Sequence, residues 1–306
     1  MREFEIIESI RTANAALGTT VVIPPGDDLG MIEIADGVSV LSGVDQLVGG
    51  VHLAADAPAE DHGRKVVNRS LSDVAAMAAV PVGFILSATL PRELMTNEGW
   101  AERFADAARE ASSRFDAPVF GGDVATHGRT GGVFVASATV LAVPDPHAGG
   151  RVVLRGGAQV GDIVCVSGCF GGSLRPDGRG HHLDFLPRVE FALELHRTLG
   201  TRLHSMIDVS DGLAADAAHI GRESSVSVVL RAEDVPRRGS STAVQALTDG
   251  EDYELCFTVS PDGSLPEALS GVPITPIGII EAGDGMRITD EGVALELERD
   301  GWEHSG

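Results

Sequence analysis

The sequence predicts an α+β protein made of two α/β domains. Short apolar runs of strand length alternate along the chain with longer segments whose apolar residues recur at helical spacing. At 306 residues the chain is long enough for two domains, each with its own core. A Pro- and Gly-rich stretch, VPDPHAGGRVVLRGGAQVGD, interrupts the alternation. We therefore place the domain boundary near residue 147, with domains over 1–147 and 148–306.

The first domain is expected to begin with a helix over residues 2–16, because Phe4, Ile7 and Ile10 recur at near-helical spacing. The turn IPPGDD ends this helix. The elements expected after it are a strand in VSVLSGVD, a helix from about 59 to 79, a strand in VGFILSATL, a helix from about 97 to 113, a short strand in PVFGGD and a long strand in GGVFVASATVLAV.

The second domain continues the alternation of strands and helices. Strands are expected in DIVCVSG, MIDVS, SVVLRA, EDYELCFTV and PITPIGII, and helices in RVEFALELHRTL and DGLAADAAHI. The chain contains 38 glycines, and these interrupt apolar segments, which favours tight turns over disorder.

Charge and composition exclude two classes of partner. The formal net charge is −22 at pH 7, whereas binding to nucleic acid or to an anionic membrane depends on Lys and Arg side chains that neutralise phosphates. No uncharged apolar run reaches membrane-spanning length, and the opening segment MREFEIIESI lacks the apolar centre of a signal peptide. Cys165, Cys169 and Cys256 cannot all pair and show no zinc spacing. We expect a cytoplasmic protein with no nucleic-acid partner and no membrane partner.

The basic residues limit the kinds of nucleotide site. Lys65 is the only lysine among the 23 basic residues. A Walker-type site needs a lysine after a Gly-rich loop and a protein-kinase site needs a strand lysine, and neither pattern is present. If the chain handles nucleotide phosphates, another cation must offset their charge.

Aspartates stand where the expected strands or glycine turns end. They are Asp27 and Asp28 in PPGDD, Asp45 in SGVDQ, Asp123 in FGGDVA, and Asp208 and Asp211 in IDVSDG, with Asp73 joining them from the small-residue helix LSDVAAMAA. A single aspartate of this kind is commonly a turn residue or a helix cap. Carboxylates from several segments that met in one place would repel one another unless a hard cation such as Mg²⁺ bound them. Such ions bridge phosphate oxygens in phosphoryl transfer.

The spacing in IDVSDG adds a local argument. Asp208 closes an apolar strand, and Ser210 or Asp211 can cap the helix that begins at Gly212. Metal, phosphate and a helix N-terminus could then converge at this loop.

Seven blocks of the sequence resemble the thiamine-monophosphate kinase family, a branch of the superfamily that includes aminoimidazole-ribonucleotide synthetase and selenophosphate synthetase. They are PPGDD, VDQLVGGVHL, LSDVAAMAAVP, FGGD, GAQVGDIVCVSG, MIDVSDGLAADAAHI and DGEDYELCFTV, between about residues 24 and 260. The resemblance implies domains of the aminoimidazole-ribonucleotide synthetase-like type and a homodimer formed through the N-terminal sheet. It also implies direct transfer of the γ-phosphoryl group of ATP to thiamine monophosphate, with several Mg²⁺ ions, giving thiamine diphosphate.

The resemblance also implies residue roles, motif by motif. The metal ligands would be Asp28, Asp45, Asp73, Asp123, Asp208 and Asp211, with Asp123, Asp208 and Asp211 as catalytic residues. The nucleotide contacts would be Gly122, Asp123, Arg155 and Ser210. His52 and Glu251 would contact the thiamine substrate, and the terminal DGWEH matches the family's aromatic tail, so that Trp302 would stack on a substrate ring.

The sequence departs from the family pattern within several of these blocks. Gly43 and Val44 replace hydroxyl side chains before Asp45, Val124 and Ala125 replace threonines after Asp123, Ser70 replaces the Asn of the NLSD block, and Asp249 replaces the first Gly of GGED.

Alternative interpretations stay open at this stage. The acceptor could be another phosphorylated molecule used by a different enzyme of the superfamily, or the chain could be a non-catalytic paralogue that binds nucleotide or thiamine phosphate. The segment SGCFGGS fits a phosphate loop as well as an ordinary glycine turn. For Arg155, a bidentate clamp on a polyphosphate competes with a surface salt bridge. His181, His182, His204 and His219 match no metal motif.

Overall fold

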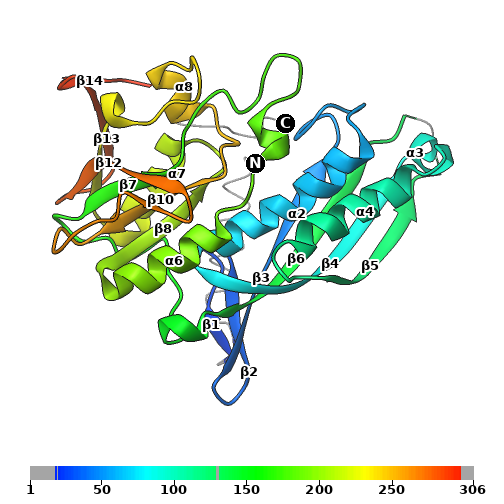
Figure 1. Cartoon of the computed structure of the whole chain (residues 1–306), viewed down its shortest axis with the longest axis horizontal. Helices are drawn as coiled ribbons and strands as arrows, with labels where there is room; N and C mark the ends of the chain where they lie inside the picture. The colour runs from blue at the N-terminus through cyan, green and yellow to red at the C-terminus, as the bar shows by residue number, and fades with distance from the viewer. Residues whose placement is uncertain (1–17, 19, 129–130, 298–306) are drawn as a thin grey trace.

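A six-stranded sheet occupies the first half of the chain (Figure 1). In spatial order it contains β1 (Val21–Ile23), β2 (Gly30–Ala35), β3 (Val38–Val48), β6 (Val135–Pro144), β4 (Ala79–Leu90) and β5 (Val119–Thr126). Neighbouring strands are antiparallel except β4 and β5, which are parallel. This computed structural model describes residues 18, 20–128 and 131–297, so the helix expected over 2–16 and Trp302 lie outside the described residues.

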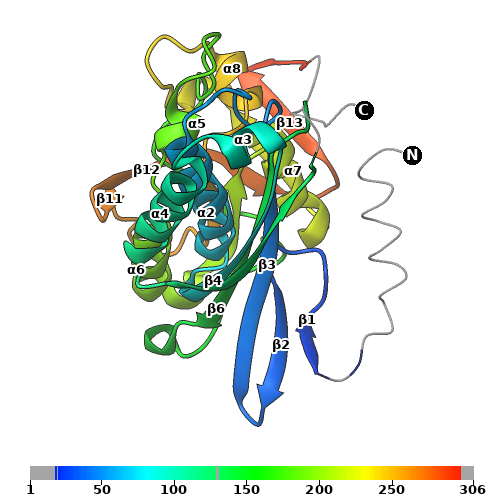
Figure 2. The same cartoon turned by 90° about the vertical axis from the view of Figure 1, so that its right-hand side faces the viewer.

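Two helices cover one face of this sheet, as Figure 2 shows. They are α2 (Ala59–Ala76) and α4 (Trp100–Ser113), and the short α3 (Arg92–Thr96) packs beside α4. The apolar face of α4 repeats at helical spacing through Phe104, Ala108 and Ala111, all of which are buried. The two helices approach closely because position 63 is glycine: a Cβ there would lie 2.2 Å from the carbonyl oxygen of Phe104.

The opposite face of the sheet carries exposed apolar side chains. The register pairs Val44 with Thr139 and Thr139 with Ile85, so these residues alternate with the buried Val140 and lie on the face away from α2. Val44 is 65% exposed, Ile85 is 41% exposed and Phe120 of β5 is 57% exposed. An apolar group of this kind on one sheet face marks a surface that another protein can cover.

An eight-stranded sheet forms the second half. In spatial order it contains β14 (Val293–Ala294), β13 (Met286–Asp290), β9 (Ser227–Arg231), β12 (Val272–Glu281), β7 (Ile163–Ser167), β10 (Glu254–Val259) and β8 (Leu203–Val209), and β11 (Ala268–Leu269) pairs with β12. The helices of this half are α5 (His181–Asp184), α6 (Val189–Leu199), α7 (Leu213–Ser224) and α8 (Ala243–Thr248), with 3₁₀ turns η1 (Pro146–Ala148), η2 (Gly200–Arg202) and η3 (Ala232–Asp234). None of the described helices is both long enough and apolar enough to span a membrane.

The predicted strands and helices that fall within the described residues are present, and the structure adds several that were not expected. The added elements include β2, α3, α8 and β13. The reason is visible in β2, whose sequence GMIEIA is mostly exposed and mixes apolar with acidic residues. Its pairing with β3 stabilises it as a strand, although its own sequence shows no clear alternation.

Helix α2 lies between the two halves (Figure 1) and packs against β3 and β6 on one side and α6 and β8 on the other. The larger hydrophobic cluster accordingly contains Leu71 of α2, Phe191 of α6 and Phe257 of β10. A second cluster fills the space between the eight-stranded sheet and α7. The two halves therefore share part of one core, and the division at residue 147 stays a prediction.

Candidate active site

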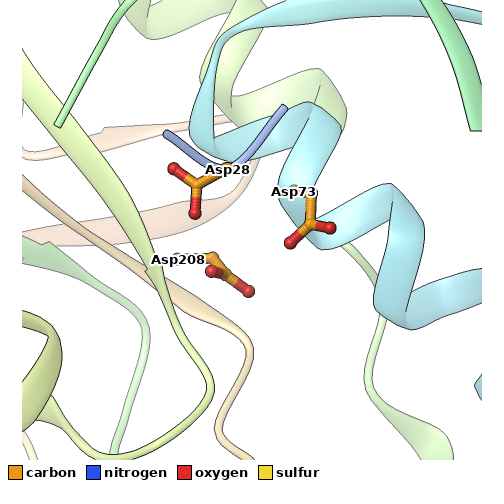
Figure 3. Close-up of side chains that lie close together, drawn as sticks. All are labelled: Asp28, Asp73 and Asp208. Carbon is orange, nitrogen blue, oxygen red and sulfur yellow. The ribbon is translucent and has the colours of Figure 1, made fainter. Parts of the chain in front are cut away.

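Three carboxylates from separate segments meet near the C-terminal end of α2 (Figure 3). Asp28 lies in the turn before β2, Asp73 in the last turn of α2, and Asp208 one residue before the end of β8. One carboxylate oxygen of each lies within 4.8 Å of the others. The structure thus brings together three of the six aspartates that the sequence marked as metal ligands.

The acidic cluster of Asp28, Asp73 and Asp208 has too few donors to hold three negative charges. Burial raises the pKa of Asp208 to about 7 and the charge of Asp28 adds to this, although Ser72 Oγ donates to Asp208 Oδ2 at 2.7 Å and lowers it. Burial also raises the pKa of Asp73 well above its usual value, with further contributions from neighbouring carboxylates. Asp28 Oδ2 is buried and has no hydrogen-bond partner in the described part of the chain. An all-oxygen set with an unpartnered oxygen fits a hard divalent cation such as Mg²⁺.

Arg155 lies beside this cluster, but its observed partners are carboxylates. Its Nη2 donates to Asp28 Oδ1 at 2.5 Å, and its backbone N–H donates to Asp27 Oδ2 at 3.2 Å. Burial raises the pKa of Asp27 to about 6, with the charge of Asp28 adding to the effect. Arg155 therefore forms a salt bridge, but with a fully buried carboxylate and not at the surface as that alternative assumed, and its contact with a nucleotide stays a prediction.

Asp45 is close to the cluster but has a cationic neighbour of its own. Its Oδ1 lies 3.5 Å from Nη2 of Arg69. Burial raises the pKa of Asp45, the charge of Arg69 opposes this, and the charges of Glu251 and Asp28 add to it. Arg69 was not among the predicted site residues, although it stands four residues before Asp73 on the same helix face.

The structure accounts for the departures just before Asp45. A Cβ at Gly43 would lie 2.5 Å from Cδ2 of Leu29, so a larger residue at position 43 would displace that side chain. Val44 points to the uncovered sheet face, away from the side that carries Asp45. Within this chain a hydroxyl at position 44 would not reach the acidic cluster.

Asp123 and Gly122 lie on the edge strand β5, outside the acidic cluster. The register pairs Asp123 with Ser87 and Ser87 with Ser137, and Ser137 alternates with the buried Ala138, so Asp123 lies on the uncovered face. Gly122 has a structural reason to be glycine, because a Cβ there would lie 2.0 Å from the carbonyl oxygen of Leu86. The metal, catalytic and nucleotide roles of these two residues stay predictions.

The prediction that Ser210 or Asp211 in IDVSDG caps the following helix is wrong. The N-cap of α7 is Gly212, so neither Ser210 nor Asp211 occupies the cap position. Instead Asp216, in the first turn of α7, accepts hydrogen bonds at its Oδ2 from the backbone N–H groups of Ser210, Asp211 and Gly212 at 3.0, 3.0 and 3.2 Å. The spacing of an aspartate four residues after Gly212 was the available signal, because a side chain in the first turn can reach the free N–H groups. The roles of Ser210 toward nucleotide and of Asp211 toward metal stay predictions.

The two predicted acceptor residues meet at a buried lysine. Lys65 is fully buried, and its Nζ donates to the carbonyl oxygen of His52 at 2.5 Å, to Nδ1 of His182 at 2.8 Å and to Oε2 of Glu251. Burial alone would raise the pKa of Glu251, but the neighbouring His182 ring, the charge and hydrogen bond of Lys65 and the charge of Arg69 lower it to about 2. Sequence reasoning missed Lys65 and His182 as parts of the site. Lys65 precedes Asp73 by two four-residue steps on α2, which could have indicated that both lie on one helix face.

The glycine loop SGCFGGS does not present two of its amides to solvent. The N–H of Gly171 donates to Asp252 Oδ1 at 3.1 Å, and the N–H of Gly172 donates to Asp249 Oδ2 at 2.9 Å. These internal carboxylates occupy the donors that a phosphate would need, so the glycine-turn interpretation describes the loop. The side chain of Asp249 thus accepts a hydrogen bond that a glycine at this position could not accept. Ser70, another departure from the family pattern, donates to the carbonyl oxygen of Ala138 at 3.0 Å.

Comparisons with known proteins agree with this fold. The family described as AIR synthase related protein, N-terminal domain, matches residues 26–143. The structure described as AaThiL complexed with AMPPCP and TMP superposes with a TM-score of 0.80 at 26% identity, covering 99% of this chain and 97% of that one. The fold is therefore of the AIR synthase related type, and residues 26–143 match the N-terminal domain of that family.

Two further comparisons decide the branch of that class. Thiamine-monophosphate kinase of Rhodopirellula baltica is 31% identical over 286 residues, which is 87% of this chain and 85% of the relative. The crystal structure of thiamine-monophosphate kinase from Stenotrophomonas maltophilia K279a has a TM-score of 0.70 at 30% identity, covering 96% of this chain and 98% of that one. The chain belongs to the thiamine-monophosphate kinase family. The predicted α+β fold of the aminoimidazole-ribonucleotide synthetase-like type and the family resemblance are confirmed.

Proposed function

We propose that this chain transfers the γ-phosphoryl group of ATP to thiamine monophosphate in the presence of Mg²⁺, giving thiamine diphosphate. One observation carries the proposal: α2 joins the acidic cluster, through Asp73, to the cluster that holds His52 and Glu251, through Lys65. A metal-type site and an acceptor-type site thus lie along one helix face. Membership of the family, and a related structure that contains AMPPCP and TMP, support the same reaction.

Each cluster supplies a different part of the chemistry. Asp28, Asp73 and Asp208 would hold Mg²⁺, which when bound offsets the negative charge of phosphate oxygens. Arg155 orients Asp28, and Ser72 donates to Asp208 and favours its ionised form. These contacts keep carboxylate oxygens directed at the site before any ligand enters.

Glu251 is suited to the cationic acceptor. Its carboxylate stays ionised because His182 lies 3.7 Å away and Lys65 donates to it, and its side chain is 24% exposed. Thiamine carries a positive charge on its thiazolium ring, which an ionised and partly exposed carboxylate can offset. The unusual backbone of this segment, with φ of +56° at Glu251 and +50° at Tyr253, is stabilised by hydrogen bonds from their N–H groups to the carbonyl oxygens of Ser210 and Val209.

A coupled ADP-release assay tests the proposal. The purified chain should release ADP with thiamine monophosphate and Mg²⁺, and release little with thiamine, with other phosphate monoesters, or in excess EDTA. ADP release with another phosphorylated acceptor, and none with thiamine monophosphate, would assign a different enzyme of the superfamily. Binding of ATP with no ADP release for any acceptor would identify a non-catalytic paralogue.

We also propose a homodimer formed through the N-terminal sheet. The exposed side chains of Val44, Ile85 and Phe120 on the face away from α2 support it, because a second copy of the same face would bury them. Light scattering after size exclusion should give the mass of a dimer, and Phe120→Asp should shift the mass towards that of a monomer. A monomeric parent protein would contradict the proposal.

A cytoplasmic location also stays a proposal. The free thiols of Cys165, Cys169 and Cys256, two of which are buried, support a reducing compartment.

A further inference from the structure

Helix α2 presents three charged side chains at four-residue intervals: Lys65, Arg69 and Asp73. Residues at this spacing lie one above another on one helix face. Lys65 contacts Glu251 at the acceptor end, and Asp73 belongs to the acidic cluster. Arg69 therefore stands between the two ends of the site, where an acceptor group would approach the transferred phosphoryl group.

Arg69 has more donors than its observed partners use. Its Nη1 donates to the carbonyl oxygen of Gln46 at 3.0 Å, and its Nη2 lies 3.5 Å from Asp45 Oδ1. Its Nε is buried and has no hydrogen-bond partner among the residues that the structure describes. A guanidinium group carries five N–H donors in a planar fork that matches carboxylate and phosphate oxygens. The unpartnered Nε thus leaves a buried donor for a further anionic oxygen.

The charge of Arg69 acts on both ends of the site. The groups that interact with it electrostatically include Asp45 and Asp73 on the metal side and Glu251 and Tyr253 on the acceptor side. Its side chain is 15% exposed, which keeps an opening to solvent while removing most of the water that would screen it.

The neighbouring cations have partners of their own. The Lys65 ammonium group has three donors, and these go to His52, His182 and Glu251 while its side chain is fully buried. The buried Nε of Arg155 also has no partner among the described residues, but its Nη2 pairs with Asp28 of the acidic cluster, whereas Arg69 lies on α2 between Lys65 and Asp73. An anion that enters between Glu251 and Asp73 would therefore meet Arg69.

We propose that Arg69 binds the phosphate group of the acceptor and makes the site specific for a phosphate monoester over the corresponding free alcohol. The inference rests on the proposed function and deepens it. In that reaction the nucleophile is an anionic phosphate oxygen that must approach the negatively charged γ-phosphoryl group of ATP. A guanidinium beside the acceptor phosphate offsets this repulsion, and its fork orients the attacking oxygen.

The test compares two ligands that differ by the phosphate alone. Titration calorimetry in Mg²⁺ would measure thiamine monophosphate and thiamine binding to the parent chain and to Arg69→Met and Arg69→Lys. Arg69→Met should weaken thiamine monophosphate binding by roughly 10- to 100-fold, the value of a charge-assisted hydrogen bond, and change thiamine binding by less than about twofold. Arg69→Lys should fall between parent and Arg69→Met, because it keeps the charge without the fork. The matched control is Arg103→Met, which removes an arginine that pairs with Glu60 at the start of α2 and should change neither affinity.

Several results would overturn the assignment of Arg69. Equal losses of affinity for thiamine monophosphate and thiamine, or no loss of affinity for either, would contradict the assignment of Arg69 to the acceptor phosphate. A loss of affinity for a non-hydrolysable ATP analogue, with unchanged affinity for the acceptor, would show that Arg69 acts at the metal and nucleotide side of the site, where Asp45 lies. If melting curves show that Arg69→Met does not fold, Arg69→Lys decides, and unchanged selectivity in that variant overturns the inference. Failure of the proposed function is distinguishable, because the parent chain would then neither bind nor phosphorylate thiamine monophosphate.

Discussion

The acidic cluster and the Lys65 cluster, which consists of Lys65, His52, His182 and Glu251, lie along one face of α2. The buried carboxylates of the two clusters have opposite environments. Asp73 and Asp208 are buried among other carboxylates, and burial raises their pKa values. Glu251 is also largely buried, yet the neighbouring His182 ring and the charge and hydrogen bond of Lys65 lower its pKa to about 2. Burial alone therefore does not decide the charge of a carboxylate; the donors around it do. The Lys65 cluster has its charges paired within the chain, whereas the acidic cluster needs a cation from outside.

The largest expected effect breaks the acidic cluster. Asp73→Asn keeps the shape of the side chain but removes a charge that would bind Mg²⁺, so turnover should fall by roughly 1,000-fold, equivalent to about 4 kcal/mol in the transition state. The metal-free variant should melt at the same or a higher temperature than the parent, because repulsion among the carboxylates is relieved. A turnover assay and melting curves with and without Mg²⁺ measure both effects.

The control for this prediction is Asp106→Asn, since Asp106 is an exposed residue of α4 that pairs with Arg109. It should leave turnover unchanged. Near-parental turnover in Asp73→Asn would remove the catalytic assignment of the acidic cluster.

The next effect breaks the Lys65 cluster, where the loss should appear in stability. Lys65→Met leaves Glu251 and the carbonyl oxygen of His52 without their buried cationic partner. The free energy of unfolding should fall by about 3 kcal/mol, because an unpaired charge remains in a largely buried position. Urea denaturation of Lys65→Met, Glu251→Gln and the double variant would measure this. The double variant should be more stable than the sum of the single losses predicts, and strict additivity would contradict the pairing.

The pH dependence of stability should sharpen the comparison, because the two clusters have opposite signs. The folded pKa of Asp208 is about 7, above its usual 3.8, so the folded state binds more protons between these values. This contribution to the stability of metal-free protein therefore decreases as pH rises from about 4 to about 7. The folded pKa of Glu251 is about 2, below its usual 4.5, so its contribution is present above about pH 4.5 and is lost as pH falls towards 2.

Denaturation across this pH range would separate the two contributions. Asp208→Asn should reduce the decrease in stability between pH 4 and 7, since Asp27 and Asp73 also have raised pKa values, and Glu251→Gln should remove the stabilisation that Glu251 contributes above pH 4.5. Parallel curves for the parent and both variants would contradict the assigned environments.

The smallest expected effect concerns the acceptor end alone. Glu251→Gln should raise the KM for thiamine monophosphate by about tenfold and change the KM for ATP by less than about twofold, because the carboxylate lies on the acceptor side of Arg69. His52→Ala should act in the same direction. Steady-state kinetics with each substrate varied in turn provides the measurement, and equal changes in both KM values would remove the acceptor assignment.

The sequence by itself determined the alternation of strands and helices, the family and the identity of the residues that carry charge. The strand-end position of Asp208 and the small-residue helix that carries Asp73 followed from short-range patterns, because hydrophobic periodicity and turn residues act within a few positions. The matching blocks also brought His52 and Glu251 into the same predicted substrate site. Their shared contact with Lys65 could not be predicted, since it joins residues 186 positions apart in the chain.

Tertiary structure decided which of the marked residues meet. Asp45 and Asp123 looked alike as strand-end aspartates, yet pairing with β4 and β6 places Asp123 on the uncovered sheet face and Asp45 on the side of α2. Likewise Gly212 is the N-cap of α7, and the carboxylate of Asp216, which was not among the predicted residues, accepts the N–H groups at the start of that helix. Strand side chains alternate with a period of two, so a single step in register moves a residue to the opposite face. That register depends on the partner strands and on the packing of α2 between the two halves, and neither is set by the residues next to the aspartate in the chain.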